Sequence, residues 1–94
     1  MKIVHCKKEP YTHYIGRLST LGNPFKMLIE EDREKVIINY EKWVRKNNHI
    51  LDIIKILPED AVLGCWCRPK SCHGDIIIKL WKEMHGVHTQ NNTN

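Results

Sequence analysis

A short apolar run followed by a cysteine-rich segment and an amphipathic helix constrains the fold of this chain most. Residues 61–67 are Ala-Val-Leu-Gly-Cys-Trp-Cys, a length and composition typical of a buried strand. Residues 74–85 place apolar side chains at helical spacing, and Gly86 follows as a C-terminal cap. We therefore predict a strand-turn-helix unit. Its turn belongs to a segment, residues 65–75, that holds Cys65, Cys67 and Cys72.

The rest of the chain predicts two more strands and two more helices. We expect strands at residues 2–7, with a central place in the sheet, and at residues 11–15. We expect helices at residues 30–46 and 49–57, the second ending at Pro58. This order predicts a small single-domain α/β sandwich, with a few-stranded, partly parallel sheet and about three helices. The domain is expected to span residues 1–87, and the polar tail at 88–94 to be disordered.

Composition narrows the cellular setting and the partners. The chain of 94 residues has 41% hydrophobic and 28% charged residues, and no apolar run approaches a membrane span. The N-terminal sequence has no apolar region of a signal peptide, so we expect a cytoplasmic protein with reduced cysteines. The net charge of +4 favours an anionic partner, while the scattered basic residues make nucleic acid an unlikely one. A narrow sheet with exposed edges favours a homodimer or higher homo-oligomer.

The 65–75 segment is compatible with three chemistries. Cys65, Cys67, Cys72 and His73 are ligand types that suit zinc, although their spacing differs from that of common zinc knuckles. Alternatively, Cys72 near a helix N-terminus would be a nucleophile assisted by His73 or Arg68, with Cys72 and His73 as the candidate catalytic residues. In the third case the helix N-terminus and Arg68 bind an anion, at the sheet edge where α/β proteins bind ligands. Cys6 is expected to be a buried hydrophobic residue.

Residues 16–25 form a long, glycine-punctuated loop that is expected to be the second wall of this site. Arg17 offers a planar fork of donors for phosphate or carboxylate, and Ser19 offers a hydroxyl group. Gly22 and Asn23 precede Pro24 in a strong turn signal. Loops of this length in a small domain are often functional. The leucines of the loop and Phe25 are expected to pack into the core.

Three aromatic residues are candidates for stacking on a ligand ring. They are Tyr11, Tyr14 and Trp66, and core packing is the default expectation for Trp66. A nucleotide, which has both a ring and a charged phosphate, would use stacking on these aromatic residues as well as the anion contacts described above.

Two motifs together resemble a known family. The first is Gly16-Arg17-x-Ser19-x-x-Gly22-Asn23-Pro24-Phe25, and the second is Gly64-Cys65-Trp66-Cys67-x-Pro69-x-x-Cys72-His73-Gly74-Asp75. With a Tyr40-x-x-Trp43 helix between them, the chain resembles the domain-of-unknown-function family numbered 4326, found in bacteria and phages. The resemblance covers residues 14–81. It implies a fold and a site, and it implies no reaction.

The favoured expectation is a protein that binds a nucleotide or an ADP-ribose-like phosphate compound without a cofactor. A phage protein that sequesters a nucleotide signal of host defence would fit this description, in the cytoplasm of the bacterial host. The alternatives are a nucleotide-processing enzyme that uses Cys72 and His73, and a zinc-stabilised interaction domain. The expected ligand contacts are Arg17, Ser19, Gly22, Asn23, Cys67, Arg68, Cys72, His73, Gly74 and Asp75.

Overall fold

Three short parallel strands form the sheet, in the order β1-β3-β2. They are β1 (Lys2–His5), β2 (His13–Tyr14) and β3 (Val62–Cys65). Ile3 and His13 both lie opposite Leu63, so β3 is paired on both sides. Because all strands run in one direction, their carboxyl ends meet at one edge of the sheet. The small parallel sheet is confirmed, but the first strand is at an edge, and its predicted central place was wrong.

β3 is central because it is the more apolar strand. Leu63, Gly64 and Cys65 are buried, whereas β1 begins with the exposed Lys2. The missing side chain of Gly64 leaves room for the ring of Tyr11, which a Cβ atom there would meet at 2.6 Å. β3 ends at Cys65 rather than at the expected residue 67, at the position paired with the last residue of β1.

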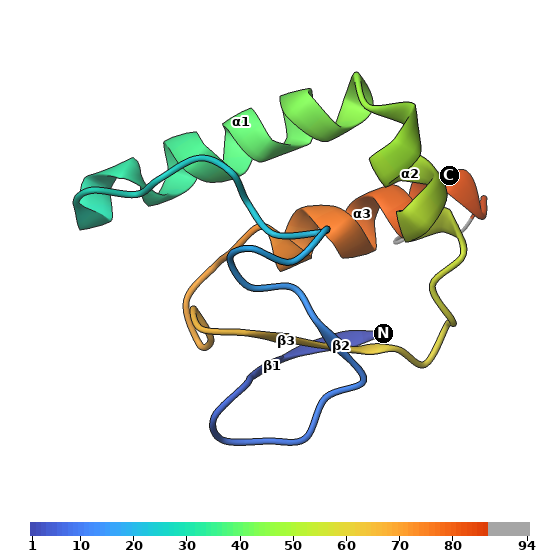
Figure 1. Ribbon diagram of the computed structural model, residues 1–94, viewed down its shortest axis with the longest axis horizontal. Coiled ribbons are helices and arrows are strands. Elements are labelled where there is room, and N and C mark those ends of the chain that lie inside the picture. The colour runs from blue at the N-terminus through green and yellow to red at the C-terminus, as the bar shows by residue number, and fades with distance from the viewer. Residues whose placement is uncertain (87–94) are drawn as a thin grey trace, which may run out of the picture.

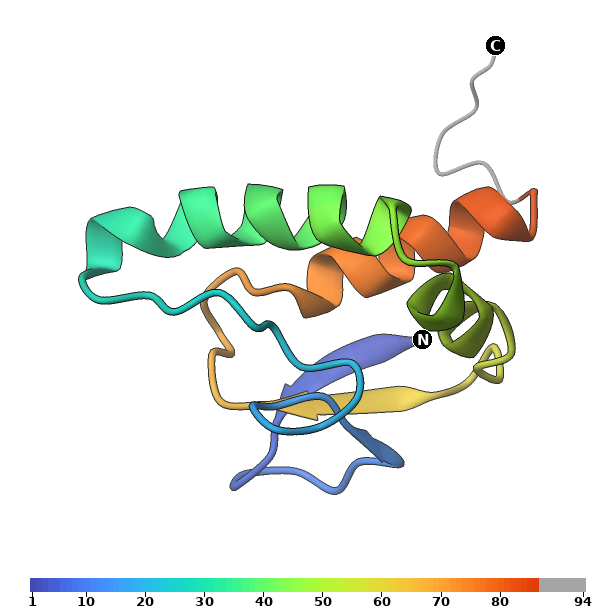
Figure 2. The ribbon, with the colours of Figure 1, turned by 45° about the horizontal axis from the view of Figure 1, so that its top comes forward.

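The helices all lie on one face of the sheet (Figures 1 and 2). A 3-10 turn, η1 (Glu30–Asp32), leads into α1 (Arg33–Arg45), followed by α2 (Asn48–Lys55) and, after β3, by α3 (Gly74–Met84). All three predicted helices are confirmed, with ends that differ by a few residues. Asn47 caps α2 by accepting a hydrogen bond from the Ile50 amide. Gly86 follows α3 with a φ of +68°, in the left-handed conformation of a helix C-cap.

The core lies between the sheet and the helices. Its most deeply buried side chains are Ile15, Tyr40, Val44, Ile54, Leu63, Cys65, Ile77 and Leu80. The Trp81 indole donates a hydrogen bond to the Leu57 carbonyl oxygen at 2.8 Å, which ties α3 to the end of the α2 segment. The strand-turn-helix unit that the sequence predicted therefore contributes to the centre of the core.

Tyr40 of α1 anchors the 16–25 loop. Its buried hydroxyl donates a hydrogen bond to the carbonyl oxygen of Leu21 at 2.8 Å. Leu21 is buried, as expected, but Leu18 is fully exposed with a φ of +70°. The prediction that the loop packs against the core is therefore right at Leu21 and wrong at Leu18.

Removal of this hydroxyl tests the anchor. We expect Tyr40→Phe to lower the free energy of unfolding by about 1–2 kcal/mol, because the Leu21 carbonyl loses its buried donor. Urea unfolding measures the change. Tyr11→Phe is the matched control, since Tyr11 is exposed and is expected to change stability by less than about 0.5 kcal/mol. Equal effects of the two variants would contradict the anchoring role.

The structure, a computed structural model, describes residues 1–86. The tail expected at residues 88–94 lies outside the described residues. Across 1–86, every helix is too short or too polar to cross a membrane.

Candidate functional site

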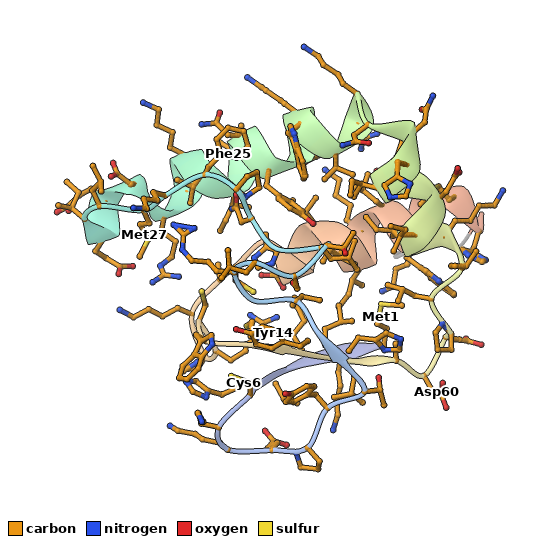
Figure 3. All side chains as sticks on the ribbon, viewed as in Figure 1. Met1, Cys6, Tyr14, Phe25, Met27 and Asp60 are labelled. Carbon is orange, nitrogen blue, oxygen red and sulfur yellow. The ribbon has the colours of Figure 1, made fainter. Side chains whose placement is uncertain are left out.

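A cleft of about 380 Å³ opens at the carboxyl edge of the sheet, where ligand sites of parallel α/β proteins occur. The ends of β2 and β3, the 16–25 loop, the start of α1 and the 65–75 segment surround it. Figure 3 labels Phe25 and Met27 beside α1 and Tyr14 at the end of β2. The lining residues are Tyr14, Gly16, Arg17, Asn23, Phe25, Met27, Arg33, Val36, Ile37, Cys65, Trp66, Cys67, Ser71, Cys72 and His73.

The two arginines of the cleft have different partners. Arg33 pairs with Glu30, with 2.6 Å between Nε and Oε2, and it also donates to the Ser71 carbonyl oxygen at 2.9 Å. The Glu30 carboxylate, followed by Cys67, raises the pKa of Arg33 above its ordinary value. Arg17 is exposed and makes no ion pair with any other residue in 1–86. Arg33 therefore fixes the turn against α1, and Arg17 is the cation available to a ligand.

Two aromatic side chains stand together at the mouth of the cleft. The Trp66 indole donates a hydrogen bond to the Tyr14 hydroxyl at 2.8 Å. Trp66 is 54% exposed, so its expected place in the core was wrong. The Lys7 ammonium lies 5.5 Å from the centre of its ring, a cation–π distance. These contacts hold an exposed indole at the cleft, where it can receive a planar group.

Three thiol side chains line the inner part of the cleft, and two of them touch. The Sγ atoms of Cys65 and Cys72 are 3.4 Å apart, and the Gly74 amide donates to Cys72 Sγ at 3.3 Å. Hydrogen bonds from the Cys67 and Cys72 thiols hold the pKa of Cys65 well below its ordinary value. The same contact with Cys65 raises the pKa of Cys72. The two thiols are therefore coupled: when one of them loses its proton, the other can donate a hydrogen bond to it.

His73 is a structural residue in this geometry. It is buried, its Nε2 lies 2.7 Å from the Ile15 carbonyl oxygen, and its ring packs edge-on against Tyr40. Because a carbonyl oxygen only accepts, Nε2 carries the proton and donates it to this bond. Burial lowers the pKa of His73 and outweighs the opposing effects of the Ile15 bond and of Cys65 and Asp75. Nε2 is thus committed to Ile15, and no hydrogen bond within residues 1–86 joins His73 to Cys72.

The buried imidazole predicts a specific pH dependence of stability. The folded-state pKa of His73 lies below the ordinary value of 6.5, so the unfolded chain binds a proton first as the pH falls. Stability is therefore full above about pH 6.5 and decreases below it, by at most about 1.4 kcal/mol per pH unit. His73→Gln keeps an amide donor near the Nε2 position and should flatten this slope. Urea unfolding between pH 7 and pH 5 measures it.

The matched control for this measurement is His49→Gln, which removes an exposed histidine from α2. It should keep the wild-type slope. An unchanged slope in the folded His73→Gln variant would contradict the assignment.

Five of the expected ligand contacts line the cleft, and five lie elsewhere. Arg17, Asn23, Cys67, Cys72 and His73 are in its wall. The other five are outside it, each with a partner of its own: Ser19, Gly22, Arg68, Gly74 and Asp75.

Contacts with other residues of the protein explain why four of these five residues do not line the cleft. The Ser19 hydroxyl donates to the Gly16 carbonyl oxygen at 2.6 Å and shapes its own loop. Arg68 and Asp75 form an ion pair at 2.7 Å, and Asp75 also accepts from the Cys72 amide. Asp75 therefore stabilises the turn before α3, as a first-turn carboxylate does. Gly74 is buried against Ile3 and Ile15, where a side chain would meet their methyl groups.

Several cleft residues were not expected from the sequence. Arg33, Val36 and Ile37 reach the site because α1 begins beside it. Met27 comes from the chain before this helix, and Ser71 from the 65–75 segment. The amphipathic pattern of the helix identified its apolar face, but not the stretch of that face that the core leaves open. Phe25, expected in the core, is half-buried in the cleft wall instead.

The zinc alternative needs three or more converging ligands. Within residues 1–86, no group of three or more histidine, cysteine or acidic side chains is arranged to hold a metal ion. His73, one of the four expected ligands, uses Nε2 for Ile15.

Comparison with known proteins gives one match. Residues 2–83 match the family described as Domain of unknown function (DUF4326). No curated protein and no solved structure matches the chain. The match covers the whole sheet, all three helices to within a residue, and the whole cleft.

Proposed function

The chain belongs to the domain-of-unknown-function family DUF4326, and we propose that its cleft binds a nucleotide or an ADP-ribose-like phosphate compound. The observation that carries this proposal is that one cleft combines Arg17, a cation without an ion pair within residues 1–86, with an exposed aromatic pair, Tyr14 and Trp66. A guanidinium group binds phosphate oxygens through two parallel hydrogen bonds. An exposed indole stacks on a planar base.

The remaining lining supports a ligand with an apolar or ring portion beside its charge. Phe25, Met27, Val36 and Ile37 supply an apolar wall, and Asn23 lies among them. The Asn23 side chain donates to the Val36 carbonyl oxygen and accepts from the Phe25 amide, so it holds the loop against α1. A volume of about 380 Å³ is within the range of small-molecule sites, roughly 300–1,000 Å³.

A thermal-shift panel tests this proposal. The panel contains ribonucleoside mono-, di- and triphosphates, cyclic dinucleotides, ADP-ribose and the parent nucleosides. A ligand at about 100 times its Kd stabilises the folded state by about 2.7 kcal/mol, which shifts Tm by about 10–20 °C in a domain of this size. We expect at least one phosphorylated member to shift Tm and its parent nucleoside to shift it less. No shift with any phosphorylated member would contradict the proposal.

Sequestration and catalysis are distinguished by whether the ligand recovered from the protein is unchanged or altered. A nucleotide signal of host defence is one ligand of the proposed class, and a phage protein that sequesters it would release it unchanged. The enzyme alternative is favoured by one observation, the three thiol groups in the cleft wall. Mass spectrometry of the ligand after incubation separates the two, since altered ligand supports the enzyme and unchanged ligand supports binding.

A further inference from the structure

Two thiol groups in the cleft wall are placed to react with each other. Cys65 ends β3 and Cys72 precedes α3, and their sulfur atoms are 3.4 Å apart with no other atom between them. The turn between them is closed by the hydrogen bond from the Lys70 amide to the Cys67 carbonyl oxygen, at 2.8 Å. A modest approach of the two sulfur atoms would bring them to bonding distance, about 2.05 Å.

The surroundings favour a thiolate at this place. The Gly74 amide at the start of α3 donates to Cys72 Sγ, and two guanidinium groups are held at the segment, where Arg33 donates to the Ser71 carbonyl oxygen and Arg68 to that of Lys70. Positive charge and helix N-termini stabilise thiolates, which are the reactive form of cysteine. At Cys65, hydrogen bonds from the Cys67 and Cys72 thiols and from the Cys67 and Arg68 backbone lower the pKa. The bland alternative is a pair of inert core residues, since both side chains are buried.

The position of these two cysteines in the wall of the cleft argues against an inert pair. Cys65 and Cys72 both contribute to its wall, although only 1% and 2% of these residues is exposed, so an oxidant that reaches the two sulfur atoms from the cleft must be small. We propose that Cys65 and Cys72 form a redox-active dithiol that a small hydroperoxide oxidises to a disulfide in the wall of the cleft. This inference does not depend on the identity, or the existence, of a nucleotide ligand.

The reaction has two steps and needs only hydrogen peroxide as oxidant. The Cys65 thiolate attacks one peroxide oxygen, the O–O bond breaks, and a sulfenic acid forms while hydroxide leaves and takes up a proton as water. The Cys72 sulfur then attacks the Cys65 sulfur, the S–O bond breaks, and a second water leaves with the Cys72 proton. The two cysteines are oxidised by two electrons, and one peroxide is reduced to two water molecules.

Peptide mapping of the whole protein tests the proposal. Trypsin cleaves after Lys55, Lys70 and Lys79 and spares the Arg68-Pro69 bond, so residues 56–70 and 71–79 become separate peptides. After treatment with hydrogen peroxide and alkylation of free thiols, we expect these two peptides linked, with fragmentation placing the bridge at Cys65. Dithiothreitol should separate them again.

Matched variants identify the partners. Cys6→Ser and Cys67→Ser should keep the linked peptides, whereas Cys65→Ser and Cys72→Ser should lose them. Fragmentation of the linked wild-type peptides decides the case even where a variant does not fold. The proposal is overturned by a bridge at Cys67, by linkage between two chains, or by oxidation that gives only sulfinic and sulfonic acids.

Discussion

Arg17→Ala is expected to weaken nucleotide binding by about 10- to 100-fold, the largest effect of any single substitution in the cleft. A hydrogen bond to a charged group contributes about 1.5–3 kcal/mol, and each 1.4 kcal/mol is a factor of ten in Kd. Arg17 is exposed and unpaired within residues 1–86, so its removal should leave the fold intact. Titration calorimetry measures Kd for the phosphorylated ligand that gives the largest thermal shift.

Two further variants separate geometry from net charge. Arg17→Lys keeps the charge and loses the planar fork, so we expect intermediate affinity. Lys42→Ala removes one positive charge from an exposed position of α1 that does not line the cleft, and its Kd should stay within about twofold of wild type. If Lys42→Ala weakens binding as much as Arg17→Ala, the binding is a general charge effect and the role of Arg17 is wrong.

Gly22→Ala is expected to have the largest effect on the fold of the site. A Cβ atom at Gly22 would overlap the backbone carbonyl oxygen of Gly16 and lie 3.1 Å from that of Ser19. Both are backbone atoms, so no flexible side chain can move aside, and the hydrogen bond from the Gly22 amide to the Ser19 carbonyl oxygen would be disturbed. We expect a loss of about 1–3 kcal/mol in stability, or about 4–20 °C in Tm.

The same change should also displace Arg17, because the loop that carries it is closed by these contacts. Thr20→Ala is the control, since Thr20 is exposed in the same loop. It should leave Tm within about 4 °C of wild type. A wild-type Tm for Gly22→Ala would contradict the close packing of this loop.

Much of the fold followed from local patterns. The apolar spacing of residues 33–45 and 74–84 predicted α1 and α3, and Pro58 limited α2. The order of strands did not follow, because the central place depends on burial from two sides. Residues 2–7 and 61–67 are both apolar runs, and only tertiary packing shows that Tyr11 covers Gly64 and that Lys2 faces solvent.

The candidate site was located more reliably than its contacts were assigned. The carboxyl edge of a parallel sheet predicted that the 16–25 loop and the 65–75 segment would meet, and both line the cleft. The roles of single residues depend on distances that no spacing gives. Asp75 and Ser19 carry the right functional groups, but each satisfies a local partner. Arg33 was missed because its approach depends on how α1 packs.

The structure also changed the interpretation of the thiols. The position of Cys72 before a helix favoured it as a nucleophile assisted by His73 or Arg68. The contact with Cys65 couples the two thiols, and the bond to Ile15 commits Nε2 of His73 elsewhere. A motif shows which chemical groups are close in sequence, whereas proton positions follow from contacts across the fold.

The most direct test of nucleotide binding at this cleft uses the indole N–H signals of the three tryptophans in an NMR titration. The Trp66 indole donates to Tyr14 at the cleft, and the Trp81 indole donates to Leu57 in the core. Titration with ADP-ribose and the nucleotide panel should shift the Trp66 signal saturably with at least one ligand and leave the Trp81 signal in place. An unmoved Trp66 signal with every phosphorylated ligand at millimolar concentration would contradict the assignment of this cleft as a nucleotide site.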